Sequence, residues 1–320
     1  MGATTRDIFG LAPAAESATP GTYGQQPSGY RLPQETRLGA VRLQVADLGR
    51  SIAFYEDTLG MRTVARDASR SDLAAQGDSP VLVRLEERAG AKPSGQGLLG
   101  LYHFAILLPD RPSLARFAQH LADRGLPAGA SDHRVSEAFY LSDPDGLGIE
   151  VYADRPRESW QREGRQLMIS TDPIDMRGLL ASAKGTTWTG MPTGTVIGHV
   201  HLHVGDIAQG SAFFSEALGF DRMTWRYPGA LFLGAGGYHH HLGTNIWAGP
   251  GARPPAEDDA RLLEWTIEVP ARTDVDGAAE SLTRAGHDVQ AAQAGDVVVT
   301  DPWGTVIRIR ALDGEASNHE

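Results

Sequence analysis

The feature that most constrains the fold of this chain is a pattern that occurs four times along it. In its clearest copies an apolar strand segment is followed by Asp47 or Asp206, then by an amphipathic stretch, and then by a glycine that ends the helix. The four copies lie at about 38–95, 101–155, 196–249 and 260–312. We therefore predict an α+β fold of four βαβββ modules, each made of a strand, a helix and three further strands.

Composition divides the chain around these modules. Residues 1–36 are rich in Gly, Pro, Ala, Ser and Thr and show no sustained period, which is typical of an irregular arm. The segments that we expect after this arm are a first domain of two modules at 37–155, a connector at 156–195, a second domain of two modules at 196–313 and a tail at 314–320. Asp154 and Trp160 flank the start of the connector, where we expect them to close the second module onto it.

The overall composition argues against several classes of protein. The formal net charge of −11 disfavours nucleic-acid and anionic-membrane partners, because both attract basic surfaces. The sequence has neither a run of about 18 apolar residues that would span a bilayer nor the pattern of a secretory signal, so we expect a cytoplasmic protein without a membrane partner. Because the chain has no cysteine, any metal must be held by nitrogen and oxygen.

Two histidines and one glutamate stand on predicted strands of neighbouring modules. His103 lies at the start of the second module, Glu150 lies on a later strand of the same module, and His199 opens the third module. Two imidazoles and one carboxylate can hold a divalent ion on one face and leave the opposite face open. Such a set suits non-haem Fe(II), and Mn(II) has nearly the same ligand preferences.

Three strings of uncommon residues are similar to one known family. They are LYHFAILLP at 101–109, GIEVYADRP at 148–156 and GYHHHLG at 237–243. These strings resemble the bacterial catechol 2,3-dioxygenase branch of the vicinal oxygen chelate superfamily, and the repeat resembles that superfamily over roughly residues 38–312. The resemblance implies a glyoxalase-like fold, in which paired modules form two half-open barrels around a metal. It also implies an extradiol dioxygenase, which uses O₂ to open a catechol ring beside its hydroxyls and gives a 2-hydroxymuconate-semialdehyde-type product.

Each module offers one candidate ligand at the start of its first strand. From the first module to the fourth, the residues at this position are Ala40, His103, His199 and Glu264. The place that Glu150 takes in the second module belongs to Arg308 in the fourth. An arginine cannot ligate a cation, so we expect no metal in a barrel made of modules one and four.

The choice of ligands depends on which modules pair. If module two pairs with module three, His103, Glu150 and His199 come together, and we predict these three as the metal ligands. The alternative keeps modules three and four together and takes His199, His240 and Glu264 as ligands.

The resemblance also implies roles for side chains near the metal. In the family a His and a Tyr of the closing module border the bound catechol, and His133 and Tyr140 stand in the same order here. The second His of a pair in the partner module serves as acid–base catalyst. Our best alignment places that role on His240, while the adjacent His239 and His241 keep two other assignments open.

Two further histidines are expected to contact the substrate. His201 lies two residues after His199 on the same predicted strand, so both side chains point to the same face. His203 shares that face as well. His241 follows His240, and strand alternation turns it away from the metal, leaving at most a contact with the edge of the substrate.

Two other functions fit the same fold. A metal-dependent isomerase or lyase of the glyoxalase kind would fill four ligand positions, with the fourth near His240 or His241. A small-molecule-binding protein without enzymatic activity would have no use for the predicted ligands. For the dioxygenase we expect a catechol-type small molecule and O₂ as partners, together with assembly into a homo-oligomer.

Overall fold

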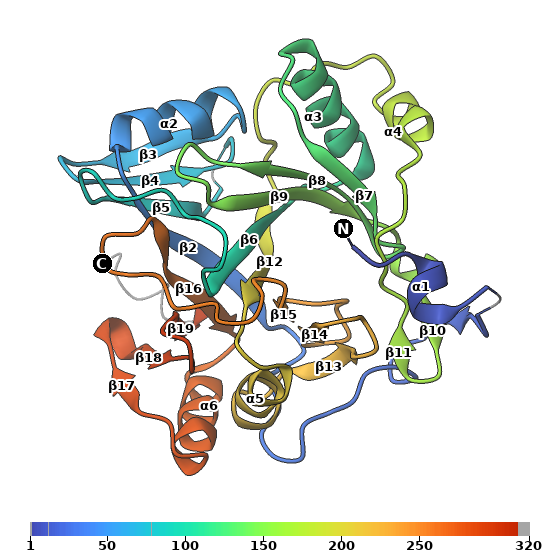
Figure 1. Ribbon diagram of the computed structural model, residues 1–320, viewed down its shortest axis with the longest axis vertical. Coiled ribbons are helices and arrows are strands. Elements are labelled where there is room, and N and C mark those ends of the chain that lie inside the picture. Colours follow the sequence, from blue (N-terminus) through green and yellow to red (C-terminus); the bar gives the residue numbers. More distant parts are fainter. Residues whose placement is uncertain (1, 12, 78, 313–320) are drawn as a thin grey trace.

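The computed structural model describes residues 2–11, 13–77 and 79–312 of the chain. Within these ranges the strands form two eight-stranded sheets and one three-stranded sheet. Figure 1 shows the two large sheets next to each other, with helices on their outer faces. This arrangement confirms the predicted α+β fold of βαβββ modules. None of the helices in the described part has the length and apolar character needed to cross a membrane.

One large sheet, here called the histidine sheet, joins the second and third modules. Its strands, in their order across the sheet, are β13 (Asp221–Thr224), β14 (Ala230–Gly234), β15 (Leu242–Asn245), β12 (Val196–His203), β6 (Gly100–Leu107), β9 (Gly148–Asp154), β8 (Ser136–Ser142) and β7 (Gly129–Asp132). The central strands β12 and β6 are antiparallel, whereas β9 runs parallel to β6. This order confirms the predicted pairing of module two with module three.

The other large sheet, here called the arginine sheet, joins the first and fourth modules. Its strands, in order, are β17 (Val289–Ala291), β18 (Val297–Thr300), β19 (Val306–Ala311), β16 (Arg261–Val269), β2 (Arg37–Val45), β5 (Val81–Glu87), β4 (Arg70–Ala74) and β3 (Arg62–Arg66). The alternative that pairs module three with module four is therefore wrong. Each sheet takes one module from each half of the chain, so the sheets do not mark where one domain ends and the next begins. The domain limits at 37–155 and 196–313 therefore stay a prediction.

Four helical segments cover the sheets. They are α2 (Leu48–Asp57), α3 (Arg111–Asp123), α5 (Ile207–Gly210) with its π-helical continuation η2 (Ser211–Ala217), and α6 (Arg272–Arg284). Asp47, Asp110 and Asp206 precede the first three, and each carboxylate accepts the backbone N–H three residues further on. These contacts satisfy donors that the first helical turn leaves free, which is why the predicted Asp positions mark the helix starts.

Strand alternation separates an apolar face of the histidine sheet from a polar one. On β12, Val200 and Leu202 are fully buried in the hydrophobic core, while His199 and His201 project from the opposite face. On β6, Phe104 belongs to the core and its neighbour His103 projects from the polar face. Burial of the apolar face thus decides which side chains the concave face can present.

The N-terminal arm and the connector pack together. They contain α1 (Thr5–Phe9), β1 (Glu16–Ser17), η1 (Arg157–Ser159), β10 (Gln161–Glu163), β11 (Gln166–Leu167) and α4 (Met176–Ser182). One further short helical turn, η3 (Gln293–Gly295), lies outside them in the fourth module. Strands β1, β10 and β11 form the three-stranded sheet. The arm, which we predicted to be irregular, therefore includes a helix and a strand. The predicted tail at 314–320 lies outside the described residues.

Candidate metal centre and active-site cavity

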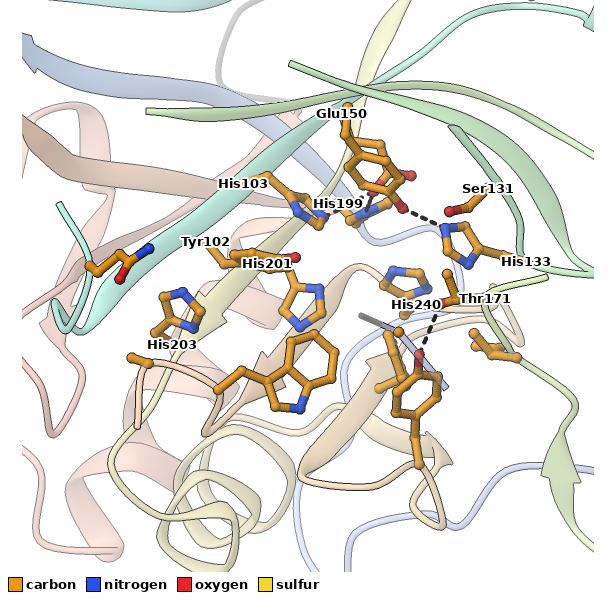
Figure 2. A pocket seen from close by; sticks show the side chains of 18 of the residues that line it. Tyr102, His103, Ser131, His133, Glu150, Thr171, His199, His201, His203 and His240 are labelled. Carbon is orange, nitrogen blue, oxygen red and sulfur yellow. Dashed lines mark hydrogen bonds and ion pairs between the residues drawn. The ribbon is translucent and has the colours of Figure 1, made fainter. Parts of the chain in front are cut away.

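Three adjacent strands of the histidine sheet bring two imidazoles and a carboxylate together. His103 on β6, Glu150 on β9 and His199 on β12 each offer one ligand atom, and these atoms all lie within 4.8 Å of one another. All three residues are at least 95% buried, with exposed fractions of 5%, 2% and 2%. Figure 2 shows the two imidazole rings beneath the Glu150 carboxylate, facing a shared space. The sheet topology thus unites the three residues that we predicted as ligands.

The contacts among these groups fit a bound cation. His103 Nε2 lies 3.0 Å from Glu150 Oε2, and His199 Nε2 lies 3.3 Å from the same oxygen. Nevertheless, His103 Nε2 is fully buried and has no hydrogen-bond partner in suitable geometry among the described residues. An unpaired buried nitrogen is costly unless another species satisfies it. The nitrogens and the carboxylate oxygen therefore have the arrangement of ligands that share one ion, and nitrogen and oxygen donors suit Fe(II) or Mn(II).

The charge states also suit metal binding. Burial lowers the pKa of His199 to about 4, and the nearby Glu150 carboxylate only partly opposes this shift. Burial by itself would raise the pKa of Glu150, but the imidazoles of His199 and His103 outweigh it and hold that pKa well below its usual value. A neutral imidazole and an ionised carboxylate are the forms that bind metals.

His133 and Tyr140 form a hydrogen-bonded pair beside the three predicted ligands. His133 Nδ1 lies 2.5 Å from the carbonyl oxygen of Ser170, so this nitrogen carries the hydrogen and donates it to the carbonyl. In this tautomer Nε2 of His133 accepts the hydrogen bond of the Tyr140 hydroxyl. Burial, followed by the negative charge of Glu150, raises the pKa of Tyr140 well above its usual value. The hydroxyl therefore stays protonated, and both side chains line the same cavity.

The three consecutive histidines between β14 and β15 occupy different places. His240 lines the cavity, and its ring centroid lies 4.1 Å from that of His199. Burial lowers the pKa of His240 well below its usual value, so the imidazole is neutral. His241 is not among the described residues that line the cavity. Its ring stacks on Phe220, and its Nδ1 accepts the backbone N–H of Ala235 at 3.2 Å. The geometry therefore gives no support to the predicted contact of His241 with a substrate.

A cavity of about 760 Å³ is lined in part by the three predicted ligands. The other described residues that line it are Gly2, Gly95, Gln96, Gly97, Tyr102, Ser131, His133, Tyr140, Ile169, Thr171, His201, His203, Tyr227, Phe232, His240, Trp247 and Ala248. Most of them are aromatic, imidazole or small side chains. Such a lining suits a flat, partly polar aromatic molecule.

His201 and His203 extend the polar wall of the cavity away from the three predicted ligands. Asn245 holds both rings, because its amide nitrogen donates to His201 Nε2 at 3.0 Å and its amide oxygen accepts from His203 Nδ1 at 2.6 Å. The ring of Trp247 packs against His201 with a centroid distance of 5.7 Å. The structure thus places His201 at the cavity, as expected for a substrate-contacting residue, and its role stays a prediction.

The N-terminal arm reaches the cavity, which the sequence reasoning missed. Gly2 lines the cavity, and the backbone N–H of Ala3 donates to the Tyr227 hydroxyl at 2.7 Å. Thr171 of the connector also contacts that hydroxyl, at 2.8 Å. The sequence did contain one sign of order in the arm. Thr4 followed three positions later by Asp7 is a pattern that marks helix starts, and these residues do cap α1.

Comparison with known proteins places these observations in a family. The family model described as "Glyoxalase/Bleomycin resistance protein/Dioxygenase superfamily" matches residues 37–151 and 196–309. A catechol-2,3-dioxygenase of Bacillus subtilis is 41% identical over 261 residues, which cover 80% of this chain and 91% of that protein. A 2,2',3-trihydroxybiphenyl dioxygenase of Sphingomonas paucimobilis is 23% identical over 245 residues, which cover 76% of this chain and 74% of the relative.

Solved structures agree with the fold. Glyoxalase I from Zea mays superposes with a TM-score of 0.50 and 17% identity, covering 86% of this chain and 92% of the maize chain. At that identity the likeness concerns the fold alone. Because the family model matches both halves of the chain and a relative is 41% identical over 80% of it, the chain belongs to the glyoxalase/bleomycin resistance protein/dioxygenase superfamily, as an enzyme of the catechol 2,3-dioxygenase type.

Proposed function

We propose that this enzyme cleaves the ring of a catechol, or of a substituted catechol, beside its hydroxyl groups with O₂. The product is of the 2-hydroxymuconate-semialdehyde type. The observation that carries the proposal is the convergence of His103, Glu150 and His199 at the wall of a cavity that also holds a buried neutral imidazole, His240. The names of the two curated relatives support the reaction class.

The three converging residues would hold Fe(II), with Mn(II) as the other metal of suitable ligand preference. When bound there, such an ion supplies Lewis-acid and redox chemistry toward the two catechol oxygens and O₂. The ligands occupy one wall of the cavity, so a substrate approaches from the other side. The sheet holds all three ligands on rigid strands, which keeps their geometry when the substrate enters.

The remaining polar side chains would handle the protons of the substrate. His240 is neutral and faces the cavity, so it can accept a phenolic proton and return it later. The pair of His133 and Tyr140 lines the same cavity, and the Tyr140 hydroxyl can turn from His133 to donate a hydrogen bond to a substrate oxygen as negative charge develops. His201 would contact the ring from the neighbouring part of the wall.

Anaerobic loading with Fe(II), followed by catechol and air, tests the proposal. We expect a yellow ring-fission product, formed in proportion to bound iron and absent from the metal-free protein. A parallel sample loaded with Mn(II) separates the two candidate metals. Bound metal without ring cleavage by any catechol would overturn the proposal and leave the glyoxalase-type reaction as the alternative. Light scattering of the same preparation tests the predicted homo-oligomer.

A further inference from the structure

A chain of hydrogen bonds runs from the cavity through two histidines to a carboxylate. His240 Nδ1 lies 2.7 Å from His239 Nδ1, and His239 Nε2 lies 2.9 Å from Asp154 Oδ1. Asp154 is the last residue of β9, the strand that also carries Glu150. None of the steps described above uses Asp154 or His239.

The carboxylate determines the order of hydrogens along this chain. An ionised carboxylate only accepts, so His239 Nε2 must carry a hydrogen and donate it to Asp154. The tautomer of His239 that carries its hydrogen on Nε2 has a bare acceptor at Nδ1. His240 Nδ1 must therefore carry the hydrogen of the next bond, which leaves Nε2 of His240 without one. Within the described residues that Nε2 has no hydrogen-bond partner, and the ring lines the cavity.

The surroundings keep these groups in place. His239 is fully buried, with the Trp160 ring edge-on to it at a centroid distance of 5.4 Å. The Tyr238 hydroxyl donates to the same Asp154 oxygen at 3.3 Å. The side chain of Asp154 is 27% exposed, so its negative charge needs no buried partner. A partly hydrated carboxylate can thus act on a buried imidazole without the cost of burying its own charge.

We propose that Asp154 is a positioning residue that, through His239, fixes the tautomer and the orientation of His240. This leaves a bare Nε2 on a ring that lines the cavity, which is the form that a base for a phenolic proton requires. This assignment rests on the proposed role of His240, and it adds two residues that touch neither the substrate nor the metal. The same logic operates when a buried carboxylate orients a catalytic histidine in other enzymes.

Asp154→Ala tests the chain of contacts by kinetics. We expect turnover to fall by about tenfold or more, because part of the His240 population takes the wrong tautomer or rotates. Metal content and the KM for catechol should stay near those of the parent. Tyr238→Phe is the matched control, since it removes the other hydrogen bond to Asp154 and leaves the bond to His239 in place. Its turnover should stay within about threefold of the parent.

A double variant separates positioning from a structural role. If Asp154 acts only through His240, then adding Asp154→Ala to His240→Phe causes no further loss of turnover. An equal loss in both backgrounds would overturn the proposal. If His240→Phe itself leaves turnover unchanged, the proposed role of His240 fails instead, and the inference falls with it. If His240→Phe lowers turnover as expected but Asp154→Ala does not, only the positioning role of Asp154 is overturned.

The tautomer itself is observable without turnover. In protein labelled with ¹⁵N-histidine and loaded with diamagnetic Zn(II), long-range ¹H–¹⁵N spectra distinguish a protonated ring nitrogen from a bare one. The signals that vanish in His240→Phe identify the ring. We expect a protonated Nδ1 and a bare Nε2 in the parent and a mixture of tautomers in Asp154→Ala. A hydrogen on Nε2 of His240 in the parent, or identical spectra for parent and variant, would overturn the proposal.

Discussion

The centres of the two large sheets occupy the same place in the repeat and hold opposite chemistry. In the histidine sheet His103 Nε2 lies 3.0 Å from Glu150 without a suitable hydrogen bond. In the arginine sheet the equivalent pair is Glu264 and Arg308, joined by two hydrogen bonds of 2.9 and 3.0 Å. The place of His199 is taken by Ala40.

The comparison shows what a metal site needs besides a carboxylate. The guanidinium of Arg308 satisfies both oxygens of Glu264 and supplies the positive charge itself. The imidazole of His199 beside Glu150 is neutral and offers a nitrogen lone pair rather than a positive charge. One scaffold therefore forms a closed ion pair in one sheet and an open set of candidate ligands in the other. The difference depends on three side chains.

Removal of a ligand should have the largest effect. We expect Glu150→Ala to abolish both iron binding and ring cleavage, because three ligands leave no redundancy. His103→Ala and His199→Ala should do the same. Metal analysis after gel filtration, together with turnover of catechol, measures both losses. Glu264→Ala is the matched control in the other sheet, and loss of iron from it would mean that the two centres are not as different as their contacts indicate.

Replacement of the proposed base should have the next largest effect. His240→Phe should keep iron and bind catechol, because neither depends on that imidazole in the proposed mechanism. Turnover should fall by a factor of about 10²–10⁴, the usual contribution of general acid–base catalysis. Steady-state kinetics with metal analysis tests this. Loss of iron would make His240 a fourth ligand, as a glyoxalase-type site requires.

Acid should weaken the histidine sheet through its buried imidazoles. Burial lowers the pKa of His241 to about 3, whereas the unfolded chain has the ordinary value of 6.5. Between these values the unfolded state binds the extra proton, so stability falls as pH decreases from about 6.5 toward 3. One such group contributes a slope of at most about 1.4 kcal/mol per pH unit. Urea unfolding of the metal-free protein across this range should show a shallower slope for His241→Phe, and an unchanged slope would contradict the assignment.

The smallest effect is expected for the ion pair of the arginine sheet. Glu264→Ala leaves Arg308 with Asp296, whose carboxylate accepts from its guanidinium at 3.2 Å. We therefore expect a loss of about 1 kcal/mol in the free energy of unfolding, as for a partly exposed pair. Thermal or urea unfolding measures it. A larger loss would show that the stability of the arginine sheet depends on this ion pair.

Sequence reasoning reached the module repeat, the helix starts at Asp47 and Asp206, and the three residues that converge in the structure. These features depend on local periodicity, on capping chemistry and on comparison between copies, all of which are visible along the chain. The assignment of His241 to a substrate contact had no such basis. Its direction is set by a turn and by packing on Phe220, which no repeat predicts.

Two sets of contacts between segments that lie far apart in the chain could not be predicted from the sequence. Asp154 was expected to help close the second module onto the connector, yet its carboxylate bonds to His239, 85 residues away. Gly2 of the arm lines the cavity, and Ala3 bonds to Tyr227, which lies more than 200 residues later in the chain. Such contacts join segments with unrelated patterns, so only the packed structure brings them to light.

By itself the sequence determined which structural units and which ligand types this protein has. It specified four modules, a metal site limited to nitrogen and oxygen ligands, and an arginine where the other pair of modules would need a carboxylate. Only the tertiary structure decided which modules share a sheet, and thereby that His103, Glu150 and His199 meet. The reason is physical: every module has the same strand edges and apolar faces to pair and bury. The choice of partner depends on how all four pack at once.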